Sequence, residues 1–455
     1  MIRIYEYSQV DPAEIFQRET PISRVEEPVA AILADVKKRG DDAVLEYTRR
    51  FDRCDITALA VTDAEIEEAF AAVEPEFLEV LHKAAANIRS FHSAQVRQSL
   101  IQTPRSGVVL GQRITPIERV GLYVPGGTAA YPSTVLMDAI PAKIAGCEMI
   151  VMTTPPGPDG KINPAILAAA KIAGVTDIFK MGGAQAVAAL AYGTESVPKV
   201  DKIVGPGNAY VAEAKKQVFG MVAIDMIAGP SEILVLADGK SDAKVVAADM
   251  LSQAEHDRNA TAVLVTESME LAKAVQLELE AQLEVLPRRD IARASVDNNG
   301  MIIVAENLNV GIDIANRLAP EHLELMVDDP FAYLDSIRNA GSVFLGRSCP
   351  EALGDYFAGP NHTLPTSGTA RFSSPLGVDD FVKKSQFLYY TPQALDAVAE
   401  DVARFARKEG LEAHARSAVI RSGQLTVTVL NCQLSTFNCQ LQWRYIHEYF
   451  PEPED

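Results

Sequence analysis

Four short segments in the second half of the sequence place histidines near carboxylate or amide side chains. They read LSQAEHD at 251–257, APEHLE at 319–324, GDYFAGPNHTLPT at 354–366 and EGLEAH at 409–414. Together they contain four of the seven histidines in the chain. Histidine and acidic residues that converge from separate segments are the usual components of a metal site with an adjacent acid or base. The four segments therefore predict a site of that kind.

The first segment ends a helical pattern over residues 242–256, for which Asp242 is the expected N-cap. Gln253 and His256 are three residues apart, so a helix would place both on one face, where they can bind one ion. In the third segment, Asp355 and His362 flank a loop with glycine and proline. Such a loop can direct side chains where a strand could not.

In order and spacing, these segments resemble the histidinol dehydrogenase family, and the glycine turns between Val120 and Ser231 match as well. The resemblance runs from the N-terminal region to about Arg421. It implies a zinc- and NAD-dependent oxidation of L-histidinol through L-histidinal to L-histidine. This four-electron reaction consumes two NAD and is the last step of L-histidine biosynthesis.

The resemblance also implies one zinc ion per subunit. The implied zinc ligands are Gln253, His256, Asp355 and His414. These offer nitrogen and oxygen but no thiolate, which suits an ion that keeps open positions for substrate. Histidinol carries an imidazole and an amine, so the ion would orient the substrate more than polarise it. The implied substrate contacts are Ser231, Gln253, His256, His322, Asp355, His362, Glu409 and His414.

Glu321 and His322 form an adjacent acid–base pair after the helical pattern at 312–318. Removal of an alcohol proton needs a base that is neutral near pH 7, which favours histidine. Oxidation of the aldehyde then needs water, which a carboxylate can activate. By resemblance, His322 is the base and Glu321 activates the water. The alternative is that an adjacent glutamate and histidine at a helix end only cap the helix or face solvent.

Three glycine turns are candidates for cofactor binding, because no GxGxxG follows a predicted strand. The turns are 121–128, 181–186 and 204–210, and each leads toward a helical pattern. Free backbone N–H groups at such positions can bind pyrophosphate, and glycine permits close approach. The resemblance implies that Tyr123, Gln185 and Asn208 contact NAD. Turns of this kind are also ordinary strand–helix connections.

The elements that must position these residues alternate between short β-rich runs and helical patterns beyond Gly107, after a helical stretch at 22–91. Predicted strands are 149–153, 177–181, 202–204, 222–226, 233–237, 262–266, 301–305 and 342–345. Predicted helices are 164–172, 185–192, 210–219 and 242–256. The alternation predicts parallel sheets with helices on both faces. The resemblance implies two parallel-sheet α/β domains with incomplete Rossmann-like topology, one inserted in the other, with a helical N-terminal region and a C-terminal helical arm.

The expected domains follow from that scheme. They are an N-terminal segment (1–22), a zinc-binding and catalytic α/β domain (23–118 and 233–375), an inserted NAD-binding α/β domain (119–232), a helical dimerisation arm (376–421) and a tail (422–455). By resemblance, the arm carries Glu409 and His414 into the partner's site of a homodimer. Within the tail, residues 424–442 repeat Gln-Leu and Asn-Cys at short intervals, unlike the rest of the chain. Two alternative hypotheses would explain these repeats. One is a frameshift or read-through into repetitive DNA, and the other is a lineage-specific extension.

Bulk properties bound the function class. A chain of 455 residues is too long for one core, and its net charge of −19 argues against nucleic acid or an anionic membrane as the main partner. The start lacks a signal-peptide pattern, and no run reaches the roughly 18 apolar residues of a membrane span. Five widely spaced cysteines without CxxC favour reduced thiols in a cytoplasmic protein.

Three alternatives to this scheme remain open. A related enzyme could oxidise a different amino or hydroxyalkyl alcohol with the same zinc and NAD. A zinc hydrolase could use Glu321 to activate water without NAD. Cys349, six residues before Asp355, could act as a nucleophile, although its flanking residues supply no base and favour an inert thiol.

Overall fold

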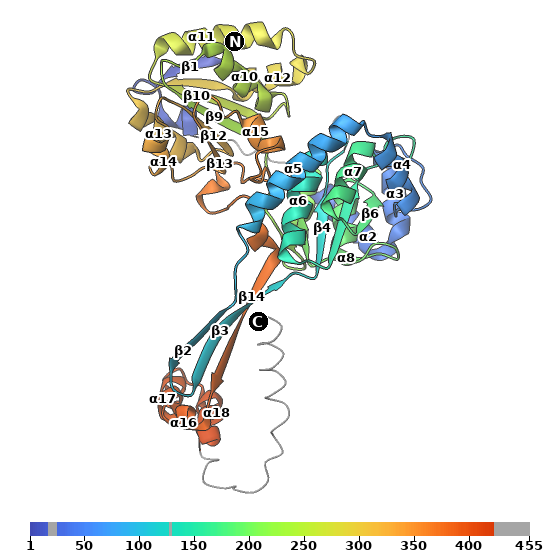
Figure 1. Cartoon of the computed structure of the whole chain (residues 1–455), viewed down its shortest axis with the longest axis vertical. Helices are drawn as coiled ribbons and strands as arrows, with labels where there is room; N and C mark the ends of the chain where they lie inside the picture. The colour runs from blue at the N-terminus through green and yellow to red at the C-terminus, as the bar shows by residue number, and fades with distance from the viewer. Residues whose placement is uncertain (17–24, 127–129, 423–455) are drawn as a thin grey trace, which may run out of the picture. The chain divides into compact units, whose positions relative to one another are not determined.

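The structure is a computed structural model that describes residues 1–16, 25–126 and 130–422. It divides into two compact units. Of these residues, the first unit comprises those within Met1–Arg97 and Thr115–Lys383, and the second comprises Gln98–Ile114 and Lys384–Ser422. Within the described residues, two parallel sheets lie in the first unit, and a third sheet belongs mainly to the second (Figure 1). No helix in these ranges is long and apolar enough to cross a membrane.

The six-stranded sheet has the order β1-β11-β10-β9-β12-β13, and its strands are parallel. Its strands are β1 (Arg3–Glu6), β9 (Glu232–Ala237), β10 (Thr261–Thr266), β11 (Met301–Val304), β12 (His322–Met326) and β13 (Ser342–Leu345). Its helices are α1 (Pro12–Phe16), α10 (Ala243–Ala254), α11 (Met269–Leu283), α12 (Arg289–Asn299), α13 (Leu308–Leu318), α14 (Phe331–Leu334) and α15 (Glu351–Tyr356). Alternate residues of β9 face opposite layers, so Ile233 packs with α10–α12 and Leu234 with α13.

The five-stranded sheet has the order β6-β5-β4-β7-β8 and is also parallel. Its strands are β4 (Arg119–Tyr123), β5 (Met149–Thr154), β6 (Asp177–Lys180), β7 (Lys202–Val204) and β8 (Ala223–Ile224). Helices α6 (Pro132–Ala145), α7 (Pro164–Ala173), α8 (Gly183–Tyr192) and α9 (Ala209–Val218) connect them. If β1 is left out, the two sheets have the same topology, because the spatial order of their strands follows the same sequence of chain positions. That order reverses direction between β9 and β12 in one sheet and between β4 and β7 in the other.

The helical N-terminal region was predicted correctly as helix, but it packs elsewhere than expected. Its helices are α2 (Glu26–Arg39), α3 (Asp41–Phe51), α4 (Asp63–Ala72) and α5 (Pro75–Ser93). The buried faces of α2 and α3 share a core with α8, while α4 and α5 share one with α6 and α7. These helices therefore cover the five-stranded sheet, whereas residues 23–118 were expected to join the zinc-binding domain. Periodicity identifies an apolar face but not its partner.

The second unit contains strands as well as the expected helices of the arm. A sheet of order β14-β3-β2 comprises β14 (Val382–Tyr390), β3 (Val108–Pro116) and β2 (Leu100–Arg105). Helices α16 (Pro392–Asp396), α17 (Ala399–Lys408) and α18 (Glu412–Ser422) follow β14, and two 3-10 turns precede it at Thr369–Arg371 and Val378–Phe381. The arm was expected to be helical and to begin at 376, without the hairpin at 98–114. At Gly111, a Cβ would lie 2.2 Å from Phe387, so glycine permits this close packing.

Two strands that carry candidate functional residues were missed by the sequence analysis. Gly121 lies within β4, although it was taken as the start of a turn. A Cβ at Gly121 would lie 3.0 Å from Leu190, so the glycine permits α8 to pack closely on the strand. His322 begins β12, although the helical pattern before it suggested a helix end. Strand β12 is entirely buried, but His322 and Glu324 interrupt the continuous apolar run that usually marks a buried parallel strand.

Candidate active site

The acid–base pair lies at the amino edge of the six-stranded sheet. Helix α13 ends at Leu318, and the φ of +49° at the following residue, Ala319, turns the chain toward Pro320 and the start of β12. His322 then pairs with Ile233 of β9 in the parallel register and is 2% exposed. The change from helix to strand therefore buries the Glu321–His322 pair beside the first residues of β9.

The backbone of β9 fixes the orientation of both side chains. His322 Nδ1 lies 3.0 Å from the carbonyl oxygen of Glu232, and the Glu232 N–H donates to Glu321 Oε2 at 2.8 Å. A carbonyl oxygen can only accept, so Nδ1 must carry the proton of this hydrogen bond. In neutral His322, the lone pair is therefore on Nε2. Of the two ring nitrogens of His322, Nε2 is therefore the one that can take up a proton.

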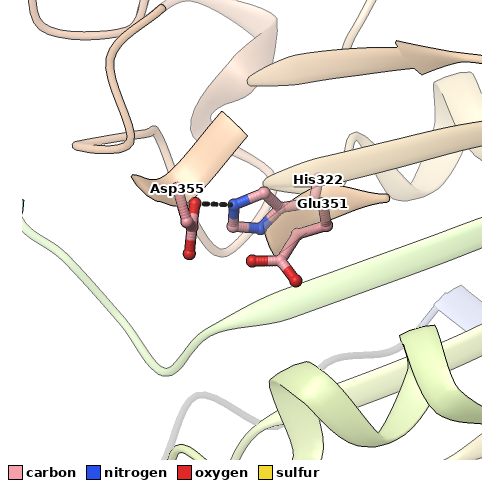
Figure 2. A group of neighbouring side chains, drawn as sticks. All are labelled: His322, Glu351 and Asp355. Atoms are coloured by element: carbon pink, nitrogen blue, oxygen red, sulfur yellow. Dashed lines mark hydrogen bonds and ion pairs between the residues drawn. The ribbon is translucent and has the colours of Figure 1, made fainter. Parts of the chain in front are cut away.

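His322 Nε2 faces Asp355 and lies 3.3 Å from Asp355 Oδ1 (Figure 2). Burial alone would lower the pKa of His322, but the carboxylates of Glu321 and Asp355 outweigh burial and raise that pKa to about 10. Burial raises the pKa of Glu321 to about 8, although His322 acts in the opposite direction. The two carboxylates therefore stabilise a proton that His322 has accepted.

A further acid, Glu351, joins this cluster and was not found from the sequence. One ring nitrogen of His322 and one carboxylate oxygen each of Glu351 and Asp355 lie within 4.8 Å of one another, close enough to bind one metal ion (Figure 2). Ser252 Oγ donates to Glu351 Oε2 at 2.8 Å, which joins the end of α10 to α15. The sequence did contain a signal that could have identified Glu351. It lies four residues before Asp355, so a helix places both side chains on one face.

The end of α10 differs from the expected geometry. The helix ends at Ala254, so His256 lies beyond it and its N–H donates to the Gln253 carbonyl at 3.1 Å. Gln253 is 1% exposed, and neither amide atom of its side chain has a hydrogen-bond partner among the described residues. Burial lowers the pKa of His256, which favours the neutral ring that binds metals. Buried amides without partners are costly, so Gln253 fits a ligand site.

Two further predicted substrate contacts lie at the same edge. Ser231 immediately precedes Glu232, whose backbone binds Glu321 and His322. His362 lies after α15, and its Nδ1 is 3.0 Å from the Asp355 carbonyl oxygen. The first unit therefore brings together Ser231, Gln253, His256, Glu321, His322, Asp355 and His362. Glu409 and His414 belong to the second unit, where both are exposed. Cys349 precedes α15, and no described bond joins its thiol to His322.

The candidate cofactor residues lie at the carboxyl ends of the strands of the five-stranded sheet. The Tyr123 hydroxyl, at the end of β4, accepts from the Gly183 N–H at 3.0 Å. Gln185 lies in the first turn of α8, is 1% exposed, and has no partner for its side-chain amide within the ranges described. Asn208 caps α9 by accepting from the N–H groups of Tyr210 and Val211. Residues 127–129 of the first turn lie outside the described ranges.

The turn at 204–210 is anchored by a buried ion pair. The Gly205 N–H donates to Asp225 Oδ2 at 2.8 Å, and Lys215 Nζ donates to the Gly205 carbonyl at 2.9 Å. Lys215 and Asp225 pair directly, with side-chain exposures of 2% and 1%. The pair therefore holds both backbone groups of the glycine that opens the turn.

Replacement of Lys215 by methionine should destabilise the fold by about 3–5 kcal/mol, because it leaves a buried carboxylate without its counter-charge. Urea denaturation measures this loss. Lys216→Met is the matched control, since the Lys216 side chain is 51% exposed and solvent screens its ion pairs, so its loss should change the stability far less. Equal destabilisation by the two variants would contradict the structural role of the buried pair.

Comparison with known proteins gives consistent matches. The sequence model described as histidinol dehydrogenase matches residues 16–422. The histidinol dehydrogenase of Geobacillus kaustophilus (strain HTA426) is 58% identical over 393 residues, which are 86% of this chain and 93% of that protein. That of Syntrophotalea carbinolica (strain DSM 2380) is 57% identical over 411 residues, 90% of this chain and 95% of that protein. The crystal structure of histidinol dehydrogenase from Elizabethkingia anophelis has 38% identity and a TM-score of 0.88, and the match covers 94% of this chain and 99% of that one. The tail beyond 422 lies outside the family match and the described residues.

Proposed function

This chain belongs to the histidinol dehydrogenase family, and we propose that it oxidises L-histidinol through L-histidinal to L-histidine with two NAD, as the last step of L-histidine biosynthesis. The observation that carries the proposal is the orientation of His322. Its Nδ1 is committed to the Glu232 carbonyl, and its Nε2 faces the acidic cluster. His322 is therefore placed to remove the alcohol proton in the first oxidation and the hydrate proton in the second. A zinc ion bound to Asp355 would offset the negative charge that raises the pKa of His322, so the ring would be neutral and able to accept these protons. Glu321, next to it, activates the water that adds to the aldehyde in its ionised form, which becomes the major form above its pKa of about 8.

We assign one zinc ion to Gln253, His256 and Asp355, with His414 as the fourth ligand. The unsatisfied amide of Gln253 and the neutral form favoured for His256 support this set. The geometric cluster of His322, Glu351 and Asp355 shares only Asp355 with it. We favour the Gln253 set because Glu351 already accepts from Ser252, whereas the Gln253 oxygen lacks a described donor. The ion would hold substrate nitrogens, together with Ser231, His362 and Glu409.

We place NAD at the carboxyl edge of the five-stranded sheet, in contact with Tyr123, Gln185 and Asn208. Open α/β sheets bind ligands where the strand order reverses, which is between β4 and β7 here. The unpartnered amide of Gln185 and the N-terminus of α8 supply polar groups at that edge. The cytoplasm, where NAD and reduced thiols are found, is the proposed location.

We propose that the chain is a homodimer in which Glu409 and His414 complete the site of the partner. The second unit supports this because its described core consists of three alanines, Ala403, Ala406 and Ala415, with Val419 packed against them. Several of its large apolar residues are instead exposed, including Leu100, Ile101, Leu388, Phe405 and Ile420. Exposed apolar surface of this kind marks protein–protein interfaces.

The decisive test of the activity is NADH formation, followed by absorbance, with L-histidinol as substrate. Two NADH per histidinol are expected, because the alcohol and then the aldehyde are each oxidised by one NAD. L-Phenylalaninol and L-alaninol are matched amino alcohols without imidazole, and they should give little turnover. Preference for another alcohol would favour a related dehydrogenase, and no NADH with any alcohol would favour a hydrolase.

A mixing experiment tests the shared site. Inactive His322→Asn and inactive His414→Asn chains, dissociated and re-paired, should recover about a quarter of wild-type activity, because half of the dimers are mixed and each has one intact site. Mixed dimers purified with two different tags should retain about half. If verified mixed dimers remain inactive, His414 serves its own chain.

A further inference from the structure

Three consecutive residues after α15 are each bonded to helix α6, which belongs to the other sheet of the first unit. Asn361 Nδ2 donates to the Met137 carbonyl at 2.6 Å, and Thr363 Oγ1 donates to Asp138 Oδ1 at 2.9 Å. Between them, His362 Nε2 lies 3.3 Å from Thr134 Oγ1. We refer to residues 361–363 and their partners on α6 as the α6 clamp.

The sequence of α6 leaves a backbone acceptor free for this clamp. Pro141 lies inside the helix, four residues after Met137. Proline has no N–H, so the Met137 carbonyl lacks its helical donor. The Asn361 amide occupies that acceptor, and Asn361 Oδ1 in turn accepts from the Thr363 N–H at 2.9 Å. The helix is therefore built to hold this one segment at one position.

The clamp also fixes the ring of His362. Its Nδ1 faces the Asp355 carbonyl oxygen, which can only accept, so Nδ1 carries a proton. Nε2 is then the remaining polar atom, and Thr134 is the hydroxyl that faces it. At 3.3 Å this contact is longer than a strong hydrogen bond, so Nε2 can also interact with a polar group of a ligand while Thr134 still holds the ring.

We propose that Thr134 is a positioning residue for substrate binding and acts through His362. This inference rests on the proposed function, in which His362 contacts the substrate. Helix α6 directly follows the first candidate cofactor turn, so one element adjoins the cofactor edge and orients a substrate contact. The sheet that carries the cofactor turns thereby contributes to the substrate site of the other sheet.

Thr134→Val removes the hydroxyl and keeps the shape of the side chain. The KM for L-histidinol should rise about tenfold, as expected when one ring nitrogen loses its partner, while the KM for NAD and kcat change less than about twofold. Thr134→Ala should show the same rise, and Thr134→Ser should restore wild-type behaviour. The matched control is Thr48→Val in α3, a buried threonine whose hydroxyl has no partner among the described residues. It should leave the KM unchanged.

A double-mutant cycle separates positioning from a merely structural role. In a His362→Ala background, Thr134→Val should add no further rise in KM, because its effect passes through the missing ring. A lowered melting temperature with an unchanged KM, or a full additional rise in that background, would overturn the proposal. If the wild-type protein does not reduce NAD with histidinol, the proposed function itself fails before any variant is compared.

Discussion

Replacement of His322 by asparagine should reduce both oxidation steps by about 10²–10⁴-fold, the usual cost of losing a general base. The reason is geometric, since Nε2 of His322 is the basic atom left free by the bond to the Glu232 carbonyl. Stopped-flow measurement of NADH formation from L-histidinol, and separately from L-histidinal, gives the two rates. Zinc content and melting temperature should stay near wild-type values. Loss of only one step would contradict a shared base.

Glu321→Gln distinguishes the partner's role within the same experiment. Glutamine can still accept from the Glu232 N–H, so the local geometry should survive. Histidinal oxidation should fall far more than histidinol oxidation, because only the second step needs activated water. Glu324→Gln is the matched control, since Glu324 is buried two residues along β12 and its carboxylate accepts from the Glu351 N–H. An equal loss of both steps in the Glu321 variant would refute the divided roles.

The second large effect concerns the metal. His256→Asn should lower zinc affinity by at least the 10–100-fold that follows replacement of residues supporting a metal site. Activity should fall with the zinc content and return in part at high added zinc. Elemental analysis after dialysis against a chelator, together with a zinc titration of activity, measures both effects.

His82→Asn provides the control for that measurement, because His82 is exposed on α5. It should bind zinc and turn over as the wild type does. Full zinc stoichiometry in His256→Asn after the same dialysis would remove His256 from the ligand set. Zinc loss with unchanged activity would instead show that the bound ion is not needed for the reaction.

The sequence by itself determined the residue types of the site and most of the local structure. Helix α10 begins after Asp242 as expected, because an N-cap bond to the Lys244 N–H involves only neighbouring residues. Strands β5, β7 and β13 begin where their apolar runs predicted. The family resemblance, carried by four short segments, is confirmed over residues 16–422. Such signals depend on contacts within a few positions of the chain.

Tertiary structure alone decided which of these parts meet. Nothing local to residues 26–93 shows that their apolar faces cover the five-stranded sheet, since any apolar face of suitable shape could do so. The proton position on His322 depends on a carbonyl 90 residues away, and the orientation of His362 on a hydroxyl 228 residues away. Glu351 became part of the cluster only when α15 packed against the end of α10. Spacing along the chain fixes the face of an element, whereas the partner of that face is set by the packing of the whole fold.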